Sequence, residues 1–265
     1  GHSGSTQTPG IVDYANNDDW WDDTCDGSIT ATVISNVAGI DARADVPFPA
    51  WVAVGPPAYA PQIFNLVTLY DTMYDVAVRR LGLRPDVYRD QSWQTGYRPD
   101  YAREIEPLLK RGTAYPWVAA IPPHAHQFDT ARLGDPDPAY QSLRQFIVSV
   151  LRPPTGPDYF GAPASGLTMM PFLAGDNAFY PGAPTSAYLK LTDTQYFFLQ
   201  QWANGNFDTA ARTQPVKPGE ALDRAVLENC VGGGFSPGIE MTWIVRNPVI
   251  YQEPFRLKHK EQVPT

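Results

Sequence analysis

Proline and glycine most constrain what this chain can fold into. Its 265 residues include 27 prolines and 21 glycines, together about 18% where an average chain has near 12%. That content favours many loops between short elements, and it would fit a loosely ordered chain if apolar side chains were scarce. Apolar residues make up 43% of the chain and aromatic residues 12%, which is too many for a disordered protein. The length is enough for a sizeable core.

Charge, hydropathy and cysteine content exclude several classes of protein. A formal net charge of −8 does not support nucleic-acid binding, which needs a basic surface. No stretch approaches the roughly 18 consecutive apolar residues of a membrane-spanning helix. Two cysteines, Cys25 and Cys230, are too few for a disulfide-rich scaffold or a four-cysteine zinc site. We therefore expect a soluble protein; no signal peptide is visible, and the localisation stays open.

Hydrophobic periodicity predicts an α-rich chain. Residues 29–34 and 50–54 have the composition of strands, and residues 153–187, rich in proline and glycine, are expected to form a long ordered loop. The expected fold class is mostly α with short β strands and long ordered loops (α+β). Apolar residues recur at helical spacing in five segments, at about 61–81, 99–111, 138–152, 192–205 and 218–230.

Local signals place the ends of these helices. Gly82 and Gly205 are expected to end the first and fourth helices, and Thr192 to cap the start of the fourth. In the third helix, Leu143 is expected to face the core. We expect one α-rich domain over residues 11–257, with residues 1–10 as a tag remnant and 258–265 as a tail.

Two clusters could hold a metal ion. His124 and His126 lie on an extended segment where alternate residues point the same way, but two ligands rarely suffice, so a solvent-facing loop is the competing interpretation. The acidic residues between Asp13 and Asp26 do not have the EF-hand spacing of a calcium site. Their carboxylates can instead cap a turn.

Cys230 is the most distinctive single position. It lies where an apolar helix is expected to end and a glycine-rich turn, Gly232 to Gly234, begins. The turn lacks the lysine and hydroxyl residue of a phosphate-binding loop, so its glycines more simply allow a tight turn or a close approach. A buried structural thiol and a disulfide to Cys25 are both compatible with these residues.

The sequence around Cys230 resembles a family signature. Residues 230–243 read CVGGGFSPGIEMTW, which is similar to the signature of the quinoprotein amino-acid oxidases typified by lysine ε-oxidase and glycine oxidase. Further segments that resemble the family follow in family order, and together with residues 230–243 they are specific and cover almost the whole chain. These segments are 16–27, 50–52, 56–61, 67–71, 170–176, 191–196 and 202–207.

The resemblance implies a function and a cofactor. Members of that family oxidise an amino acid or primary amine with oxygen, releasing ammonia and hydrogen peroxide. They use cysteine tryptophylquinone, a cofactor made from the protein's own cysteine and tryptophan, and Cys230 corresponds to that cysteine. A maturation enzyme and a homo-oligomer are implied as partners, besides the amine and oxygen.

The resemblance also implies a set of site residues. Cys230 would carry the cofactor, with the pocket shaped by Trp243, Phe235, Gly232 and Gly233. Acidic residues would hold the substrate ammonium or act as the base. The acidic candidates are Asp71, Asp176 and Glu240.

Two departures from the family pattern leave alternatives open. The cross-linked tryptophan of the family lies some tens of residues beyond the cysteine, whereas Trp243 is the only tryptophan after Cys230 here. The family also has an acidic residue one turn before the cysteine, where this chain has Val226. The chain is therefore expected to be shortened at both ends, as a fragment of an oxidase, as one with a displaced tryptophan partner, or as a homologue without the quinone. Such a homologue would bind a small molecule, a metal or a protein, or catalyse another reaction.

Overall fold

The computed structural model describes a defined part of the chain, to which every structural statement below refers. Residues 2–3, 20–21 and 25 are described for their backbone alone. The described ranges are 2–3, 20–21, 25–37, 39–47, 49–54, 65–113, 128–156, 159–173, 175, 188–210, 219–233 and 245–258.

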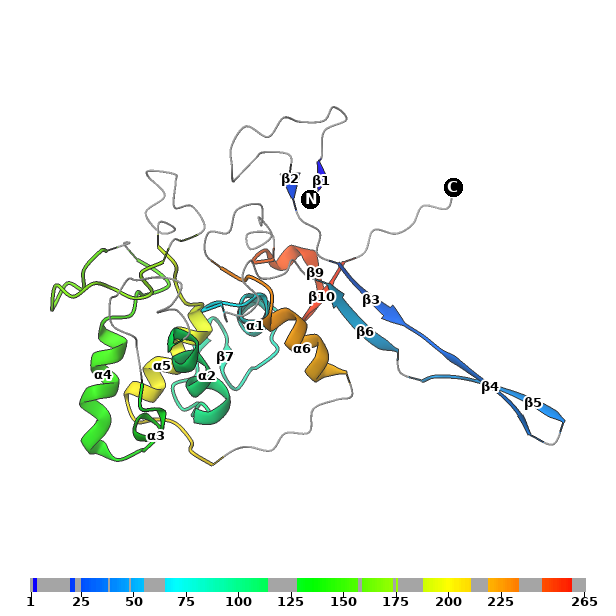
Figure 1. Cartoon of the computed structure of the whole chain (residues 1–265), viewed down its shortest axis with the longest axis horizontal. Helices are drawn as coiled ribbons and strands as arrows, with labels where there is room; N and C mark the ends of the chain where they lie inside the picture. Colours follow the sequence, from blue (N-terminus) through cyan, green and yellow to red (C-terminus); the bar gives the residue numbers. More distant parts are fainter. Residues whose placement is uncertain are drawn as a thin grey trace.

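Short helices form the body of the molecule (Figure 1). A π-helical turn, Tyr101–Ile105, runs into α2, and a 3-10 turn, Pro138–Tyr140, runs into α4. Another 3-10 turn covers Pro248–Ile250. The α-helices are α1 (Leu69–Arg80), α2 (Glu106–Thr113), α3 (Thr130–Leu133), α4 (Gln141–Ser149), α5 (Asp193–Ala203) and α6 (Glu220–Glu228).

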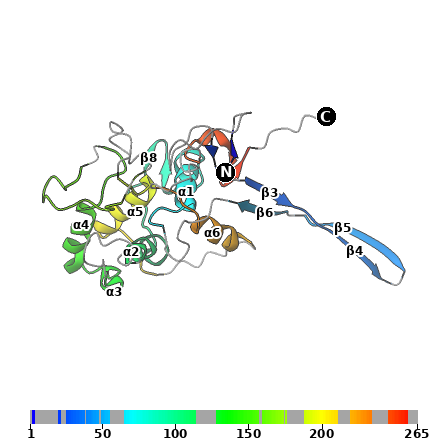
Figure 2. The same cartoon turned by 45° about the horizontal axis from the view of Figure 1, so that its top comes forward.

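The strands pair as separate antiparallel two-stranded units. β3 (Cys25–Ile29) pairs with β6 (Ala50–Val54), and β4 (Thr32–Val37) with β5 (Ile40–Asp45). Together these four strands make one long ribbon that extends away from the helices in both views (Figures 1 and 2). The shorter pairs are β1 (His2–Ser3) with β2 (Trp20–Trp21), β7 (Tyr88–Arg89) with β8 (Ser92–Trp93), and β9 (Tyr251–Glu253) with β10 (Arg256–Leu257).

Helices α1 and α5 are joined by buried polar groups. Asp75 of α1 accepts hydrogen bonds from the backbone N and the Oγ1 of Thr194, at 2.8 and 2.7 Å. Arg79 then pairs with both Asp75 and Asp193, at 3.0 and 2.5 Å. Because a buried carboxylate is costly unless it is hydrogen-bonded, these contacts fix the two helices against each other.

Two apolar clusters pack on either side of this pair. The larger one surrounds α5 and includes the fully buried Trp202, whose Nε1 donates to the carbonyl of Leu133 at 3.0 Å. The smaller one lies against α1 and contains Leu69, Met73 and Cys230. Cys230 is therefore part of a packed core.

Most sequence-based expectations hold with shifted ends. Each of the five predicted helical segments contains a helix, and the strand over 50–54 is confirmed. Gly82 and Gly205 follow helix ends with φ of +69° and +78°, and Thr192 caps α5 through Gln195 N at 3.2 Å. The described elements are mixed, with helices and short antiparallel strands, so the expectation of a mostly α chain is met only in part.

Two expectations were wrong. Residues 29–34 were expected to form one strand, but β3 ends at Ile29, β4 begins at Thr32, and residues 30–31 belong to neither. The two strands also pair with different partners, β3 with β6 and β4 with β5. Leu143 was expected to face the core but is exposed, and Arg144 is buried in its place, with its Nη1 donating to the carbonyl of Asp135 at 2.7 Å.

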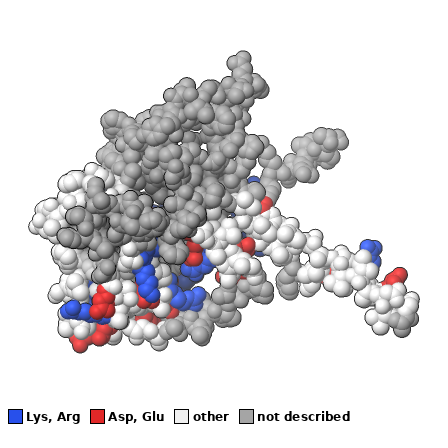
Figure 3. Space-filling model, in the orientation of Figure 1, with Lys and Arg blue, Asp and Glu red and all other residues white. Residues whose placement is uncertain are grey.

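The described residues also show how charge is distributed on one face and whether any helix is apolar enough to span a membrane. On the face seen in Figure 3, acidic and basic side chains of the described residues are interspersed rather than gathered into one basic surface. Within the same residues, none of the helices has the length and apolar content needed to cross a membrane.

Replacing Thr194 by valine tests the joint between α1 and α5. The change keeps the side-chain shape but removes one hydrogen bond to buried Asp75, so we expect the free energy of unfolding to fall by about 1–2 kcal/mol. Ser149→Ala, which removes an exposed hydroxyl, is the control and should change it by less than about 0.5 kcal/mol. Urea unfolding measures both, and equal effects would contradict this account.

Candidate functional site

Backbone pairing places Cys230 at the start of α1. Helix α6 ends at Glu228, and the next residues run antiparallel to the segment before α1, with Val231 opposite Thr68. Leu69 N donates to the Cys230 carbonyl at 2.9 Å, and Gly232 N donates to the Val67 carbonyl at 3.1 Å. The cysteine is thus held between two helices by main-chain bonds on both sides.

The thiol of Cys230 is buried and contacts a backbone carbonyl. The residue is only 3% exposed, and its Sγ donates to the carbonyl of Val226 at 3.2 Å. Burial raises the pKa of this thiol above its usual value, because a thiolate would lose its solvation. Cys230 is a free cysteine, so the alternative of a disulfide with Cys25 is not formed.

Gly232 makes the close approach that the glycine-rich sequence suggested. A Cβ on this residue would lie 1.7 Å from the Thr68 carbonyl oxygen and 2.5 Å from Leu69 N. Both are backbone atoms that cannot give way. A Cβ on Gly233 would meet the side chain of Val67 at 3.3 Å, which is tight but adjustable. Gly232 is therefore the position where glycine is required for the pairing with α1.

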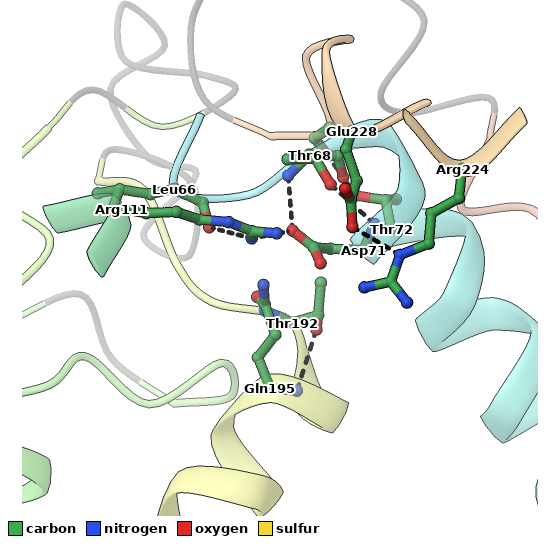
Figure 4. Close-up of polar contacts among 10 residues, drawn as sticks. Leu66, Thr68, Asp71, Thr72, Arg111, Thr192, Gln195, Arg224 and Glu228 are labelled. Carbon is green, nitrogen blue, oxygen red and sulfur yellow. Dashed lines mark hydrogen bonds and ion pairs between the residues drawn. The ribbon is translucent and has the colours of Figure 1, made fainter. Parts of the chain in front are cut away.

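Asp71 belongs to the cap of α1 (Figure 4). Its backbone N donates to Thr68 Oγ1 at 3.1 Å, while its Oδ2 accepts from Thr68 N at 2.8 Å, which is the reciprocal pattern of a capping box. The same Oδ2 accepts from Arg111 Nη1 at 2.5 Å, and both side chains are about nine-tenths buried. Asp71 was expected to be a pocket acid, and one of its two oxygens is already bound within the fold.

A second capping box faces the first. Thr192 N donates to Gln195 Oε1 at 2.9 Å, which fixes the orientation of the amide group. The Nε2 of Gln195 is buried, and none of the described residues provides it with a hydrogen-bond acceptor. Figure 4 shows this amide on the side of α5 that faces Asp71 and Arg111. A buried donor without an acceptor indicates a place for a bound water or ligand oxygen.

A stack of side chains encloses the other side of the Cys230 segment. The guanidinium of Arg224 lies 4.6 Å from the centre of the Tyr70 ring, and its Nε donates to Glu228 at 2.7 Å. Tyr70 also stacks on Phe255 at 5.3 Å. Burial raises the pKa of Tyr70, and the charge of Arg224 opposes the increase. Glu228, the acid nearest before Cys230, is therefore engaged by Arg224.

Several predicted site residues lie outside the described part of the chain. The structure thus brings Cys230, Gly232, Gly233 and Asp71 together and leaves the remaining predictions untested. Among the described residues, no group of three histidine, cysteine or acidic residues could hold a metal ion. The untested residues are His124, His126, Asp176, Phe235, Glu240 and Trp243.

Sequence reasoning missed the basic residues of this site. Arg111 is 40 positions from Asp71 and comes from α2, so no local pattern could have joined them. Arg224 and Glu228 are four residues apart, a spacing that favours ion pairs on a helix. That signal was available in the sequence.

Comparisons with known proteins agree on one family. The L-lysine ε-oxidase N-terminal model matches residues 1–54, and the model of the C-terminal domain matches residues 171–264. L-lysine 6-oxidase of Marinomonas mediterranea is 34% identical over 269 residues, covering 93% of this chain and 36% of that protein. The chain is a homologue of L-lysine ε-oxidase.

Solved structures extend this homology to the fold. The ε-lysine oxidase of M. mediterranea matches with a TM-score of 0.66 at 32% identity, covering 93% of this chain and 39% of that chain. A crystal structure of the same organism's enzyme, described as a Schiff base intermediate with L-Lys, matches with a TM-score of 0.63 at 32% identity, over 92% and 38% of the two chains.

The homology has a limited extent along the known oxidases. This chain spans little more than a third of the length of the lysine oxidases it matches, in agreement with the expected shortening. Residues 1–54 match the N-terminal model, and this range contains the first two segments of the sequence-based resemblance, at 16–27 and 50–52.

Alanine substitutions at neighbouring glycines test the pairing with α1. Gly232→Ala forces a methyl group into the Thr68 backbone, so we expect a loss of about 3 kcal/mol or more in unfolding free energy, or no soluble protein. Gly233→Ala meets only a side chain and should cost about 1 kcal/mol or less. Chemical unfolding gives both values; the account fails if the two variants are equally stable.

The pH dependence of alkylation tests the burial of Cys230. The test uses Cys25→Ser protein whose mass shows that Cys230 is unmodified. We expect an alkylating reagent to label Cys230 slowly at neutral pH. The rate should rise only above the usual thiol range, because the thiolate is the reactive form and burial raises the pKa. In the unfolded protein, Cys230 should be alkylated over the pH range in which an ordinary thiol ionises. Rapid labelling of the folded protein at neutral pH would contradict a buried thiol.

Proposed function

We propose that this chain acts as an amino-acid or primary-amine oxidase. Amine, oxygen and water would be converted to aldehyde or keto acid, ammonia and hydrogen peroxide. The observation that most supports this is the match of 93% of the chain to an L-lysine oxidase, with Cys230 in the matching signature and held at the start of α1. L-Lysine is the first substrate to test, since it is the substrate in that relative's name.

The proposed cofactor is cysteine tryptophylquinone formed on Cys230. Such a quinone would supply an electrophilic carbonyl for the amine and accept two electrons from it. The described residues provide the sulfur, in a buried apolar cluster with Leu69 and Met73, but no tryptophan is among the side chains of that cluster. They therefore fit half of the cofactor, and we propose Trp243 as the other half.

The surrounding residues have positioning roles in this proposal. The Asp71–Arg111 pair holds the cap of α1, and that cap holds the Cys230 segment in register. Thr72 supports the same turn, because its Oγ1 donates to the Gly232 carbonyl at 2.5 Å. The rigid main chain at Gly232 and Gly233 would fix the floor of the pocket, which Phe235 and Trp243 would line.

Proton transfer and ammonium binding are assigned to acids outside this network. Asp176 and Glu240 are the proposed candidates for the base and for the group that holds the substrate ammonium. Asp71 is proposed as a positioning residue, because one of its oxygens already serves the α1 cap and Arg111. The maturation enzyme implied by the family remains part of the proposal.

Oxygen-dependent turnover tests the proposed function. With L-lysine, other amino acids and simple primary amines, we expect hydrogen peroxide and ammonia in equal amounts. Cys230→Ser should abolish turnover, because the cofactor sulfur is lost, whereas the matched Cys25→Ser variant should keep it. A peroxidase-coupled assay and an ammonia assay measure the products. Absence of both products with every amine, or unchanged activity in Cys230→Ser, would contradict the proposal.

A further inference from the structure

The N-terminal turns of α1 and α5 lie close together, next to the segment that holds Cys230. Asp75, in the second turn of α1, accepts two hydrogen bonds from Thr194 in the first turn of α5. The helices have 12 and 11 residues, so each presents the positive end of a substantial dipole at its N-terminus. Two such ends close together favour a negatively charged oxygen bound between them.

The amide of Gln195 adds a buried donor between these two turns. Its Oε1 accepts from Thr192 N at 2.9 Å, and this contact decides which end of the amide is the nitrogen. Gln195 is only 5% exposed, and the described residues offer its Nε2 no acceptor. In Figure 4 the amide lies on the side of α5 that faces Asp71 and Arg111. Because a buried donor without an acceptor costs folding free energy, a ligand oxygen placed here would recover that cost.

Arg111 brings a second donor to the same place. Its Nη1 donates to the Leu66 carbonyl at 3.3 Å and to Asp71 Oδ2 at 2.5 Å. A guanidinium has five N–H groups in a planar fork, and within the described part of the chain both hydrogen bonds of Arg111 use Nη1. The Arg111 and Asp71 side chains keep 11% and 10% of their exposure, so a small ligand can reach their edge. Arginine is the cation whose geometry best matches a carboxylate.

The negative charge of Asp71 selects among possible anions. It repels an anion that carries no other group, whereas the ammonium on the α-carbon of an amino acid offsets that repulsion. Two donors beside one carboxylate therefore suit a zwitterionic amino acid better than a simple anion. The reacting amine of the substrate is a separate group, assigned to Asp176 and Glu240 in the proposed function.

We propose that Gln195 Nε2 and Arg111 bind the α-carboxylate of an amino-acid substrate. The inference rests on the proposed function and adds a specificity determinant to it, because amines without a carboxylate lack this contact. Leu69 N is bonded to the Cys230 carbonyl, and Asp71 follows in the same turn of α1, which is about 5.4 Å long. A side chain of several methylenes would carry a distal amine from the carboxylate contact toward the Cys230 segment.

Gln195→Glu tests the contact while it preserves the start of α5. Glutamate completes a capping box as glutamine does, so Thr192 N keeps its acceptor, but an oxygen replaces the donor toward the ligand. The probe is L-norleucine, which has the α-carboxylate and no distal amine, and calorimetry in anaerobic solution measures its affinity. We expect Gln195→Glu to weaken binding at least about tenfold. Gln200→Glu, the same change at an exposed position of α5, should leave the affinity unchanged.

Two further ligands identify what the wild-type protein recognises. Acetate carries a carboxylate alone, and pentylamine is norleucine without its carboxylate, so both should bind more weakly than L-norleucine. Acetate binding as tight as that of L-norleucine would indicate a general anion site and overturn the proposal. No binding of L-norleucine, as expected if water alone meets the Gln195 amide, would also overturn it.

The variants have their own contradicting results. An unchanged affinity in Gln195→Glu, or an equal loss in Gln200→Glu, would overturn the proposal. Tryptophan fluorescence during urea unfolding should give both variants the wild-type midpoint, which separates a lost contact from a lost fold.

Binding and turnover distinguish this inference from the proposed function. Amine oxidation by protein that does not bind L-norleucine would remove the inference and leave the function. Binding of L-norleucine by protein that oxidises no amine would do the reverse. In active protein, Gln195→Glu should raise the KM for L-lysine at least about tenfold. The KM for the diamine that corresponds to lysine without its carboxylate should not change, and an equal rise for both substrates would contradict the carboxylate contact.

Discussion

The pairing of residues 230–232 with the start of α1 is the constraint on which the site depends. Two main-chain hydrogen bonds, between Leu69 and Cys230 and between Gly232 and Val67, set the register. The contact of Gly232 with the Thr68 carbonyl leaves no room for any side chain. A shift of one residue would move Cys230 out of the apolar cluster and place Val231 or Asn229 there instead. The position of the thiol is therefore decided by backbone geometry before any side-chain chemistry acts.

Buried polar groups beneath this pairing keep it rigid. The N-terminus of α1 is held by Thr68 and Asp71, and Asp71 in turn by Arg111. Breaking a buried pair by removing one partner costs far more than the pair contributes when intact, so α2 and α1 are locked together at this point. The Nε2 of Gln195, for which the described residues provide no acceptor, is one exception in this region.

Local sequence patterns predicted the local structure well. The Thr192 cap, the Gly82 and Gly205 helix ends and the strand at 50–54 each depend on a few neighbouring residues, and each is confirmed. Leu143 was placed wrongly because helical periodicity assigns the apolar side to the core, whereas here the guanidinium of Arg144 is buried among backbone carbonyls. The β3 strand pairs with β6 and the β4 strand with β5, and a single β-branched run cannot reveal that its two ends pair with different strands.

The candidate site shows the same division between local and distant information. The family resemblance and the glycine-rich turn identified Cys230 and Gly232 from the sequence. The pairing of that turn with Thr68 and the contact of Arg111 with Asp71 join segments about 160 and 40 residues apart, and only the folded chain shows them. The central claim, that Cys230 is the cofactor attachment point, rests on both kinds of information.

Peptide mass spectrometry tests that claim most directly. Trypsin would release residues 225–246 as one peptide that contains both Cys230 and Trp243. The account predicts this peptide with two oxygens gained and four hydrogens lost, and with a sulfur that no longer alkylates. Recovery of the peptide at its unmodified mass, with Cys230 freely alkylated, from protein that oxidises amines would contradict the claim.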